Sequence, residues 1–588
     1  MVLLRPAPGR RQSVAAPDSR SHARPGGQRL RSVDTVCSGG FRLAALCAGL
    51  VVIETLVLLR LHAGSALALA PQVAAPAPWG VFHDERWLLV NAGSWPAVIA
   101  GAVVVVAMRG ALTAVMVKWA WPHSDGGAPS WRQALIRGCS STAVAAVLLS
   151  PCASLLVAFE LAPISDLWLA AIPTALGIAL FVHHAPVCCW WLRHPRVRSV
   201  GWIVVSYVEL TVAGGLLVVV PRAWTPVVAL AAGLADAWAW RGVIRALARP
   251  ARLRWVPISP VGLAGVVAAT VTLVTAASAP SSMASLPPHP PSTRAHGAAA
   301  LARTAQHAPA KTKPVLVVSG YGVRWTGRAP SLGQGFTTHE FSYRGIDAKG
   351  RPLPYTSAAT QQPLPVLLDM FRSQVNALAR TAGGHIDIVG ESEGSLLATI
   401  YLLTTPNPPV DHVVLLSPLV RPAGASYPPP GKDGAGIAAA WELRGIASAT
   451  NSLTPMHVSA DSPFISSLGA HGNALRHVFG CPVPGVQQFA ILPMADTVGI
   501  PSDALSVVPH ETVVALHGTL LVNPVVRYDI AQYLDGSIIS STTHDNGLAV
   551  LASAGAAAWR APPRELRASP PASAACREST AALKAWLG

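Results

Sequence analysis

The sequence predicts an α-helical transmembrane bundle followed by an α/β domain with a doubly wound, mainly parallel sheet. Of the 588 residues, 51% are hydrophobic and 12% are charged, a composition too apolar for one soluble domain. About seven apolar stretches lie before residue 280, and each approaches the roughly 20 residues that cross a hydrocarbon core. From residue 314 onwards, short apolar runs alternate with helix-like segments, which indicates buried parallel strands joined by helices.

The N-terminal 1–40 segment is predicted to be a disordered basic tail, because Arg, Pro, Gly and Ser dominate it. It is too long, and lacks a small-residue cleavage site, for an ordinary cleaved signal peptide, so the first apolar stretch is expected to stay as an anchor. The net charge of +16 comes largely from this tail and from short loops between apolar stretches. Membrane topology explains such arginines, and no nucleic-acid partner is expected.

The membrane domain is predicted to occupy residues 41–279. Basic-rich and basic-poor loops alternate between its apolar stretches, which places the N-terminus in the cytoplasm. With an odd number of spans, everything after residue 278 is extracytoplasmic, so the expected protein is a multi-pass membrane protein. The sixth span is short and is interrupted by Asp236. The expected spans are residues 41–59, 87–108, 139–161, 167–187, 200–220, 224–240 and 260–278.

Four acidic residues, Glu54, Glu160, Glu209 and Asp236, fall within or near these spans, where an ionisable group costs at least a few kcal/mol. Such groups either serve transport or a proton relay, or they hold helices together as protonated or hydrogen-bonded side chains. In the second case Arg241 is a nearby partner for Asp236. No paired broken helices and no internal repeat favour a transporter.

Residues 280–313 form a Pro/Ala-rich linker, and residues 314–560 form the α/β domain, followed by a C-terminal tail at 561–588. Residues 418–485 are rich in Pro, Gly and Ser and are predicted to be an inserted cap. One amphipathic helix carries Leu367, Phe371, Val375 and Leu378 on one face and is stopped by glycines at 383–384. The expected strands lie at 315–319, 341–345, 385–389, 413–417, 487–492 and 512–516, with a last helix at 525–534.

The segment 390–394, Gly-Glu-Ser-Glu-Gly, joins the strand from His385 to a helix that runs to about Leu403. So sharp a turn from strand to helix needs very small side chains on both sides of its apex, and it holds the serine in a strained conformation. Ser392 is therefore predicted to be a nucleophile, the alternative being an ordinary turn serine. Glu391 and Glu393 are expected to be solvated or helix N-terminal charges rather than a second acid/base pair.

On these residues, about 314–534 resemble the α/β-hydrolase superfamily, and within it the serine esterases and lipases. The membrane domain resembles no family. The resemblance implies a catalytic triad in the order Ser, acid, His. Ser392 would be followed by Asp496, just after a strand, and by His517, between the last strand and the last helix. Asp503 remains an alternative acid, and His510 and His544 remain alternative histidines.

The triad implies a serine hydroxyl whose proton is accepted by His517, with Asp496 on the other imidazole nitrogen. The resemblance supplies oxyanion donors in the backbone N–H groups of Glu393 and Tyr321, although the turn at 319–322 departs from the lipase His-Gly pattern. The expected function is a membrane-anchored, extracytoplasmic serine hydrolase that acts on an ester substrate, including a lipid ester, through an acyl-enzyme. The alternatives are an acyltransferase with the same triad, and a transporter or receptor with an inactive hydrolase-like domain.

The eight cysteines show no Cys-x-x-Cys spacing, and no metal or cofactor is predicted. Cys481 and Cys576 are the two outside the membrane domain. In an oxidising compartment a bridge between them is more expected than two free thiols, and it would pin the C-terminal tail beside the strand that leads to Asp496. The alternative is a buried free Cys481 and a disordered tail that carries Cys576.

Overall fold

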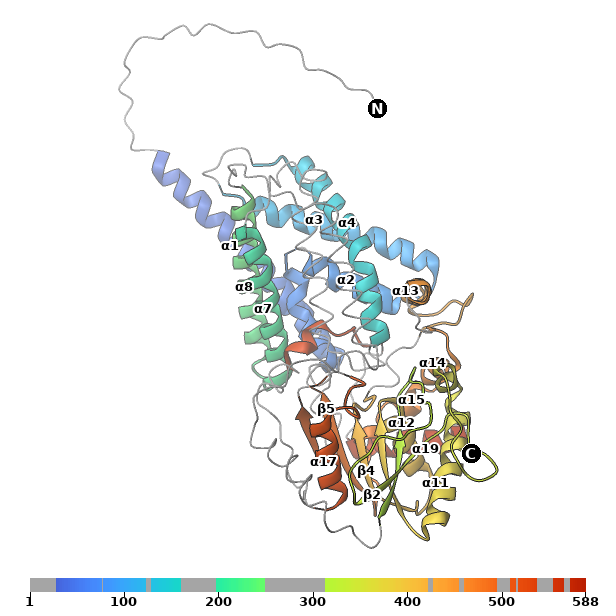
Figure 1. Ribbon diagram of the computed structural model, residues 1–588. Helices are drawn as coiled ribbons and strands as arrows, with labels where there is room; N and C mark the ends of the chain where they lie inside the picture. The colour runs from blue at the N-terminus through green and yellow to red at the C-terminus, as the bar shows by residue number, and fades with distance from the viewer. Residues whose placement is uncertain are drawn as a thin grey trace, which may run out of the picture.

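The computed structural model describes residues 28–76, 78–122, 128–159, 197–248, 312–420, 427–453, 459–493, 508–513, 515, 517–536, 554–564 and 572–587. An N-terminal bundle of helices is followed by a parallel sheet covered by helices, as the sequence predicts at this level of detail. The sheet domain lies at the end of the bundle opposite to the start of the first helix (Figure 1).

Within the described residues, five helices are long and apolar enough to cross a membrane. This agrees with a membrane protein, because a bilayer requires an apolar helix of about 20 residues. The predicted spans at 167–187 and 260–278 lie outside the described residues, so the count of seven stays a prediction. The five helices are α1 (Gln28–Arg60), α3 (Trp95–Ala120), α4 (Trp131–Phe159), α7 (Val197–Val219) and α8 (Thr225–Ala248).

Two predicted boundaries of the membrane domain are wrong. The second span, expected at 87–108, includes the end of a separate helix, α2 (Trp79–Asn91). The chain breaks there because Ser94 caps α3, its hydroxyl accepting from the backbone N–H of Ala97, and a proline stands in the first turn. In addition, α1 begins at Gln28, inside the segment predicted to be a disordered tail.

The segment between the first two spans is buried protein rather than a solvated loop. The 3-10 helix η1 (Gly64–Ala74) contacts α1, α2, α7 and α8. Its alanines leave room for this close approach, and Ala66, Ala68 and Ala70 are fully buried. Arg86, which lies between the first two predicted spans, is also buried. Its guanidinium donates to the Arg560 carbonyl at 2.6 Å and to the side-chain oxygen of Gln72.

The C-terminal half contains a six-stranded parallel sheet in the order β2-β1-β3-β4-β5-β6. Side chains of β1 alternate between two cores, with Leu316 and Val318 on one face and Val315 and Val317 on the other. Both faces are therefore covered, as a parallel sheet requires. The elements are β1 (Lys313–Val318), β2 (Phe336–Glu340), α11 (Leu364–Ala382), β3 (Ile386–Glu391), α12 (Glu393–Thr404), β4 (Val410–Leu416), β5 (Gln487–Pro493), β6 (His510–Val513) and α17 (Pro524–Leu534).

Most of these elements lie close to their predicted places. α11 buries Leu367, Phe371 and Val375 and ends at Gly383, whose φ of 73° favours glycine. The strand end expected at 341–345 is wrong, since β2 ends at Glu340 and the backbone N–H of Ser342 donates to the side chain of Gln374 instead of to a neighbouring strand. β6 begins slightly earlier than predicted, at His510.

Within the described residues, the predicted cap contains three α-helices and one short 3-10 helix. These are α13 (Ile437–Leu453), α14 (Pro463–Ala470), α15 (Gly472–Leu475) and η4 (Val478–Gly480). α13 contacts α2, α3 and α4 of the bundle. The ring of Trp441 packs against that of Trp95 at 6.2 Å, and the hydroxyl of Ser154 donates to the carboxylate of Glu442 at 2.6 Å. The cap therefore joins the sheet domain to the bundle.

A second segment of the C-terminal half, residues 554–561, is inserted into the bundle. The fully buried Trp559 stacks on Tyr207 at 4.9 Å and meets Trp79 edge-on at 5.2 Å. Its indole N–H donates to the hydroxyl of Thr211 at 2.9 Å. Two segments far apart in the sequence, α13 and residues 554–561, thus attach the sheet domain to the bundle (Figure 1).

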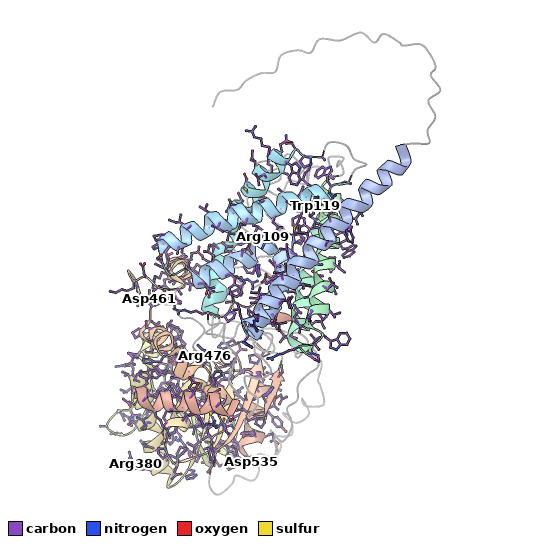
Figure 2. All side chains as sticks on the ribbon, turned by 180° about the vertical axis from the view of Figure 1, so that it is seen from behind. Arg109, Trp119, Arg380, Asp461, Arg476 and Asp535 are labelled. Atoms are coloured by element: carbon purple, nitrogen blue, oxygen red, sulfur yellow. A yellow bond between two sulfur atoms is a disulfide. The ribbon has the colours of Figure 1, made fainter. Side chains whose placement is uncertain are left out.

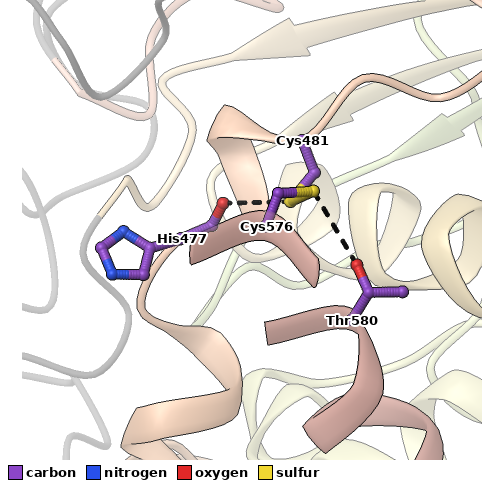
Figure 3. The surroundings of a disulfide bond; sticks show 4 residues. All are labelled: His477, Cys481, Cys576 and Thr580. Carbon is purple, nitrogen blue, oxygen red and sulfur yellow. Dashed lines mark hydrogen bonds between the residues drawn. A yellow bond between two sulfur atoms is a disulfide. The ribbon is translucent and has the colours of Figure 1, made fainter. Parts of the chain in front are cut away.

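Cys481 and Cys576 form a disulfide bond, with their Cα atoms 5.3 Å apart (Figure 3). This decides between the two alternatives that the sequence leaves open. Cys576 lies in α19 (Ala572–Leu587), which contacts α12 and α15 and buries Leu583 in the sheet domain's core. Part of the predicted C-terminal tail is therefore a docked helix.

Candidate active site

Ser392 is the single residue between the end of β3 and the start of α12, and its backbone angles are φ 55° and ψ −111°. A residue with a Cβ rarely adopts a positive φ, and such strain persists where the surrounding structure enforces it. A backbone hydrogen bond constrains this turn, because the N–H of Ser392 donates to the carbonyl of Leu416 on β4 at 2.8 Å. The strained turn that the sequence predicts at this serine is present.

The glycines around Ser392 are required by close packing rather than by their backbone angles. A Cβ on Gly390 would lie 2.6 Å from the carbonyl carbon of Gly394, and a Cβ on Gly394 would collide with the Val318 carbonyl of β1. A Cβ on Gly320, in the turn after β1, would lie 3.0 Å from the Cβ of Ser392. The three glycines allow β1, β3 and α12 to converge on the serine.

His517 follows β6 and reaches Ser392 across the carboxyl edge of the sheet. Its Nε2 lies 2.9 Å from the Oγ of Ser392. This distance is that of a hydrogen bond, in which an Nε2 that carries no proton accepts from the serine hydroxyl. The alternative His510 is the first residue of β6, and its Nδ1 lies 3.1 Å from the carbonyl oxygen of Val508. His544, the other alternative, lies outside the described residues.

Both candidate acids, Asp496 and Asp503, lie outside the described residues, so the role of Asp496 stays a prediction. β5, which leads to them, ends at Pro493, paired with Val513 of β6. Neighbouring parallel strands end at the same edge of a sheet. The chain therefore leaves β5 at the edge that carries His517.

The two predicted oxyanion donors stand on either side of Ser392. Glu393 is the first residue of α12, so its backbone N–H has no acceptor within the helix. Tyr321 follows Gly320 in the turn that touches Ser392. Its hydroxyl donates to the hydroxyl of Ser462 at 3.1 Å, and its ring packs against Phe464 of the cap. The donation of these N–H groups to an oxyanion remains a prediction.

Glu391 and Glu393 are buried, which corrects the expectation of solvated charges. Glu391 accepts a hydrogen bond from the backbone N–H of Leu520 at 3.0 Å, which ties the loop of His517 to β3. Glu393 is fully buried, and its carboxyl group has no hydrogen-bond partner among the described residues. Burial raises the pKa of Glu393 well above its usual range, which favours the neutral form of this carboxyl group.

Sequence reasoning missed a third buried acid, Glu340, at the carboxyl end of β2. Its Oε1 accepts from the hydroxyl of Ser319 at 2.7 Å and from that of Tyr355 at 3.2 Å. Burial raises the pKa of Glu340 to about 7. Its position at the carboxyl end of a strand of the parallel sheet was the available signal, because ligands of parallel sheets bind at that edge.

Glu340→Gln is expected to weaken the pH dependence of stability between about pH 4.5 and pH 7. The pKa of Glu340 is about 7 in the folded protein against 4.5 without burial, so unfolding releases a proton in this window. The free energy of unfolding of the wild type therefore falls as the pH rises towards 7, by on the order of 3 kcal/mol. Thermal unfolding of the detergent-solubilised protein across this range measures the effect.

The control for this prediction is Asp369→Asn, which changes an exposed carboxylate on α11. It should leave the pH dependence as in the wild type. If Glu340→Gln shows the wild-type slope as well, the burial of an ionisable Glu340 is contradicted.

Comparison of the chain with protein-family models, with curated proteins and with solved structures finds no match. Among the described residues, no three His, Cys, Asp or Glu side chains gather to hold a metal ion. The function is therefore inferred from the geometry around Ser392.

Proposed function

We propose that the C-terminal half is a serine hydrolase of the α/β-hydrolase type, which cleaves an ester through an acyl-enzyme on Ser392. The observation that carries this proposal is the 2.9 Å distance between the Nε2 of His517 and the Oγ of a serine held at a positive φ. Ordinary turn serines need neither the strain nor an imidazole from a distant loop. The parallel sheet, with the serine after a central strand, supports the same reading.

In the proposed reaction, neutral His517 accepts the hydroxyl proton while the Oγ of Ser392 attacks the ester carbonyl carbon. The carbonyl oxygen becomes an oxyanion, for which the backbone N–H groups of Glu393 and Tyr321 are the proposed donors. The imidazolium then gives its proton to the leaving alcohol. Water attacks the acyl-enzyme with His517 again as base, and the acid is released. Asp496 is the proposed partner of the other imidazole nitrogen.

We propose an extracytoplasmic location at the membrane surface, with a lipid ester as the substrate. The contacts to the sheet domain come from the start of α3, at Trp95, and from the later parts of α4 and α7, at Ser154 and Thr211. With a cytoplasmic N-terminus, this end of the bundle faces outward. Trp441 is exposed on the cap helix α13 beside Trp95, where aromatic side chains suit a membrane interface.

The orientation of the sheet supports a substrate that comes from the membrane. Ser392 lies at the carboxyl end of β3, and the cap leaves the sheet at the carboxyl end of the neighbouring β4. From there the cap reaches the bundle through α13. The proposed site is therefore on the sheet edge from which the chain extends to the membrane domain.

Labelling with a fluorophosphonate tests the proposal. The Oγ of Ser392 attacks phosphorus and displaces fluoride, while His517 takes the hydroxyl proton, so the full-length protein should become labelled. Ser392→Ala should abolish the label. Ser452→Ala, which changes an exposed serine on α13, should keep it. Equal labelling of the wild type and Ser392→Ala would refute the assignment of the nucleophile.

A membrane-impermeant fluorophosphonate applied to intact cells tests the location separately. Labelling without opening the membrane is expected for an extracytoplasmic site. Labelling that requires the membrane to be opened would refute the orientation and leave the hydrolase proposal standing.

A further inference from the structure

Two carboxyl groups on neighbouring helices of the bundle lack partners. Asp236 on α8 is fully buried, and neither of its carboxylate oxygens bonds to a described residue. The same holds for both buried carboxylate oxygens of Glu209 on α7 and for the hydroxyl of Ser206, one turn earlier. The two helices are in contact, since the rings of Trp202 and Trp238 meet at 4.5 Å. Glu209 is close enough for its charge to act on Asp236.

Arg241, which the sequence suggests as a partner for Asp236, makes no hydrogen bond to it. The guanidinium of Arg241 lies beside α1, where a Cβ on Gly40 would be 2.9 Å from its Nη1. The helices packed against α8 bring other groups near Asp236, namely Cys47 on α1, Glu209 on α7 and Arg109 on α3. The segment η1, which also contacts α8, has no titratable side chain.

Arg109, labelled within the bundle in Figure 2, is engaged by another carboxylate. Its Nε lies 2.7 Å from Oδ2 of Asp84, and its Nη2 lies 2.6 Å from Oδ1 of the same residue. A bidentate pair of this kind is the strongest arrangement of the two groups. Arg109 is therefore hydrogen-bonded to Asp84 and acts on Asp236 only through its charge.

His83 links Glu54 to the pair formed by Asp84 and Arg109. Its Nε2 lies 2.9 Å from Glu54, and its Nδ1 lies 2.9 Å from Asp84. Burial opposes a charge on His83, but the neighbouring Glu54 and Asp84 raise the pKa of its imidazole, which favours an imidazolium that donates to both carboxylates. The cations His83 and Arg109 then balance the carboxylates Glu54 and Asp84. Among the described residues, neither Glu209 nor Asp236 is hydrogen-bonded to this network.

We propose that Glu209 and Asp236 form a proton-binding site in the membrane domain, with protons resident on the carboxyl groups at neutral pH. Two ionised carboxylates buried side by side would cost several kcal/mol each in desolvation and would repel each other. Bound protons remove both costs. Among the described residues, no third His, Cys, Asp or Glu joins the pair as a metal ligand would.

Modification by dicyclohexylcarbodiimide tests this site. This apolar reagent enters bilayers and reacts with a protonated carboxyl group, which adds across one N=C bond while its proton moves to nitrogen. The resulting O-acylisourea rearranges to a stable N-acylurea without a further reactant. Full-length protein in lipid nanodiscs is treated at neutral pH, and the modified residue is identified by mass spectrometry of its peptides.

We expect the adduct on Glu209 or Asp236, with its rate falling about tenfold for each pH unit above the pKa of the pair. Glu54 and Asp84 are internal controls, because their carboxylates are engaged by His83 and Arg109, and they should stay unmodified. The double variant Glu209→Gln/Asp236→Asn should lose the adduct while keeping the fluorophosphonate label, which reports the folded sheet domain. Because Ser392 and the carboxyl pair lie in different halves, failure of one proposal does not affect the other.

Three results would overturn the proposal. The first is no adduct on either carboxyl group in folded protein. The second is modification of Glu54 and Asp84 to the same extent as the pair. The third is protection of the pair by sodium chloride at constant pH, which would identify the occupant as a sodium ion and not a proton.

Discussion

His517→Ala is expected to lower kcat for ester hydrolysis by about 10⁴- to 10⁶-fold, with a much smaller change in KM. Without the imidazole at 2.9 Å, the hydroxyl of Ser392 has no base to accept its proton, so the attack on the ester becomes slow. Steady-state hydrolysis of a short-chain p-nitrophenyl ester by the purified full-length protein measures both constants.

The matched control is His510→Ala, which changes the alternative histidine at the start of β6. It should retain most of the wild-type kcat, because the nitrogen that contacts the Val508 carbonyl takes no part in the proposed proton transfer. The double variant Ser392→Ala/His517→Ala should be no slower than either single variant, since the two side chains act as a unit. Equal losses in His510→Ala and His517→Ala would contradict the assignment of the base.

Cys481→Ser is expected to lower the free energy of unfolding of the sheet domain by about 2–5 kcal/mol. The bond joins residues separated by 95 positions, so its loss returns a long loop to the unfolded chain. It also frees α19 at the end held by Cys576. Because α19 contacts α12, the helix that follows Ser392, faster proteolytic release of α19 should accompany the loss of stability.

Thermal unfolding with and without a thiol reductant measures this effect. The double variant Cys481→Ser/Cys576→Ser should match the single variant, because the bond is already absent. Cys139→Ser, which changes an unbridged cysteine on α4, should keep the wild-type response to reductant. A wild-type melting temperature that is unchanged by reductant would contradict a stabilising bridge.

Features that depend on near neighbours in the chain could be predicted from the sequence. The length of an apolar stretch indicates a helix that suits a bilayer, and α1, α4, α7 and α8 lie close to the predicted spans. Gly383 ends α11 as expected, because a left-handed residue favours glycine. The turn at Ser392 was also predictable, since its two glycines stand within two residues of the serine.

Features that depend on distant segments were decided by the tertiary structure. The sequence favours His517 over His510 through the chain order of the family it resembles, but the contact itself depends on the position of β6 in the sheet, which brings this imidazole to Ser392 across 125 residues of sequence. The burial of Glu340, Glu391 and Glu393 follows from the packing of β1, α12 and the loop after β6. None of these contacts can be recognised from the composition of a short stretch of the chain.

By itself, the sequence determined the order of the two halves, the main strands and helices, and the strained serine, because periodicity and turn chemistry act over a few residues. The tertiary structure alone decided how the halves meet. α13 and Trp559 pack into the bundle, and Arg86 donates to Arg560. The sequence, by contrast, assigns α13 to a cap, Trp559 and Arg560 to the α/β domain, and Arg86 to the segment between two spans. Burial and hydrogen-bond partners depend on which surfaces meet in space, and a pattern along the chain does not contain that information.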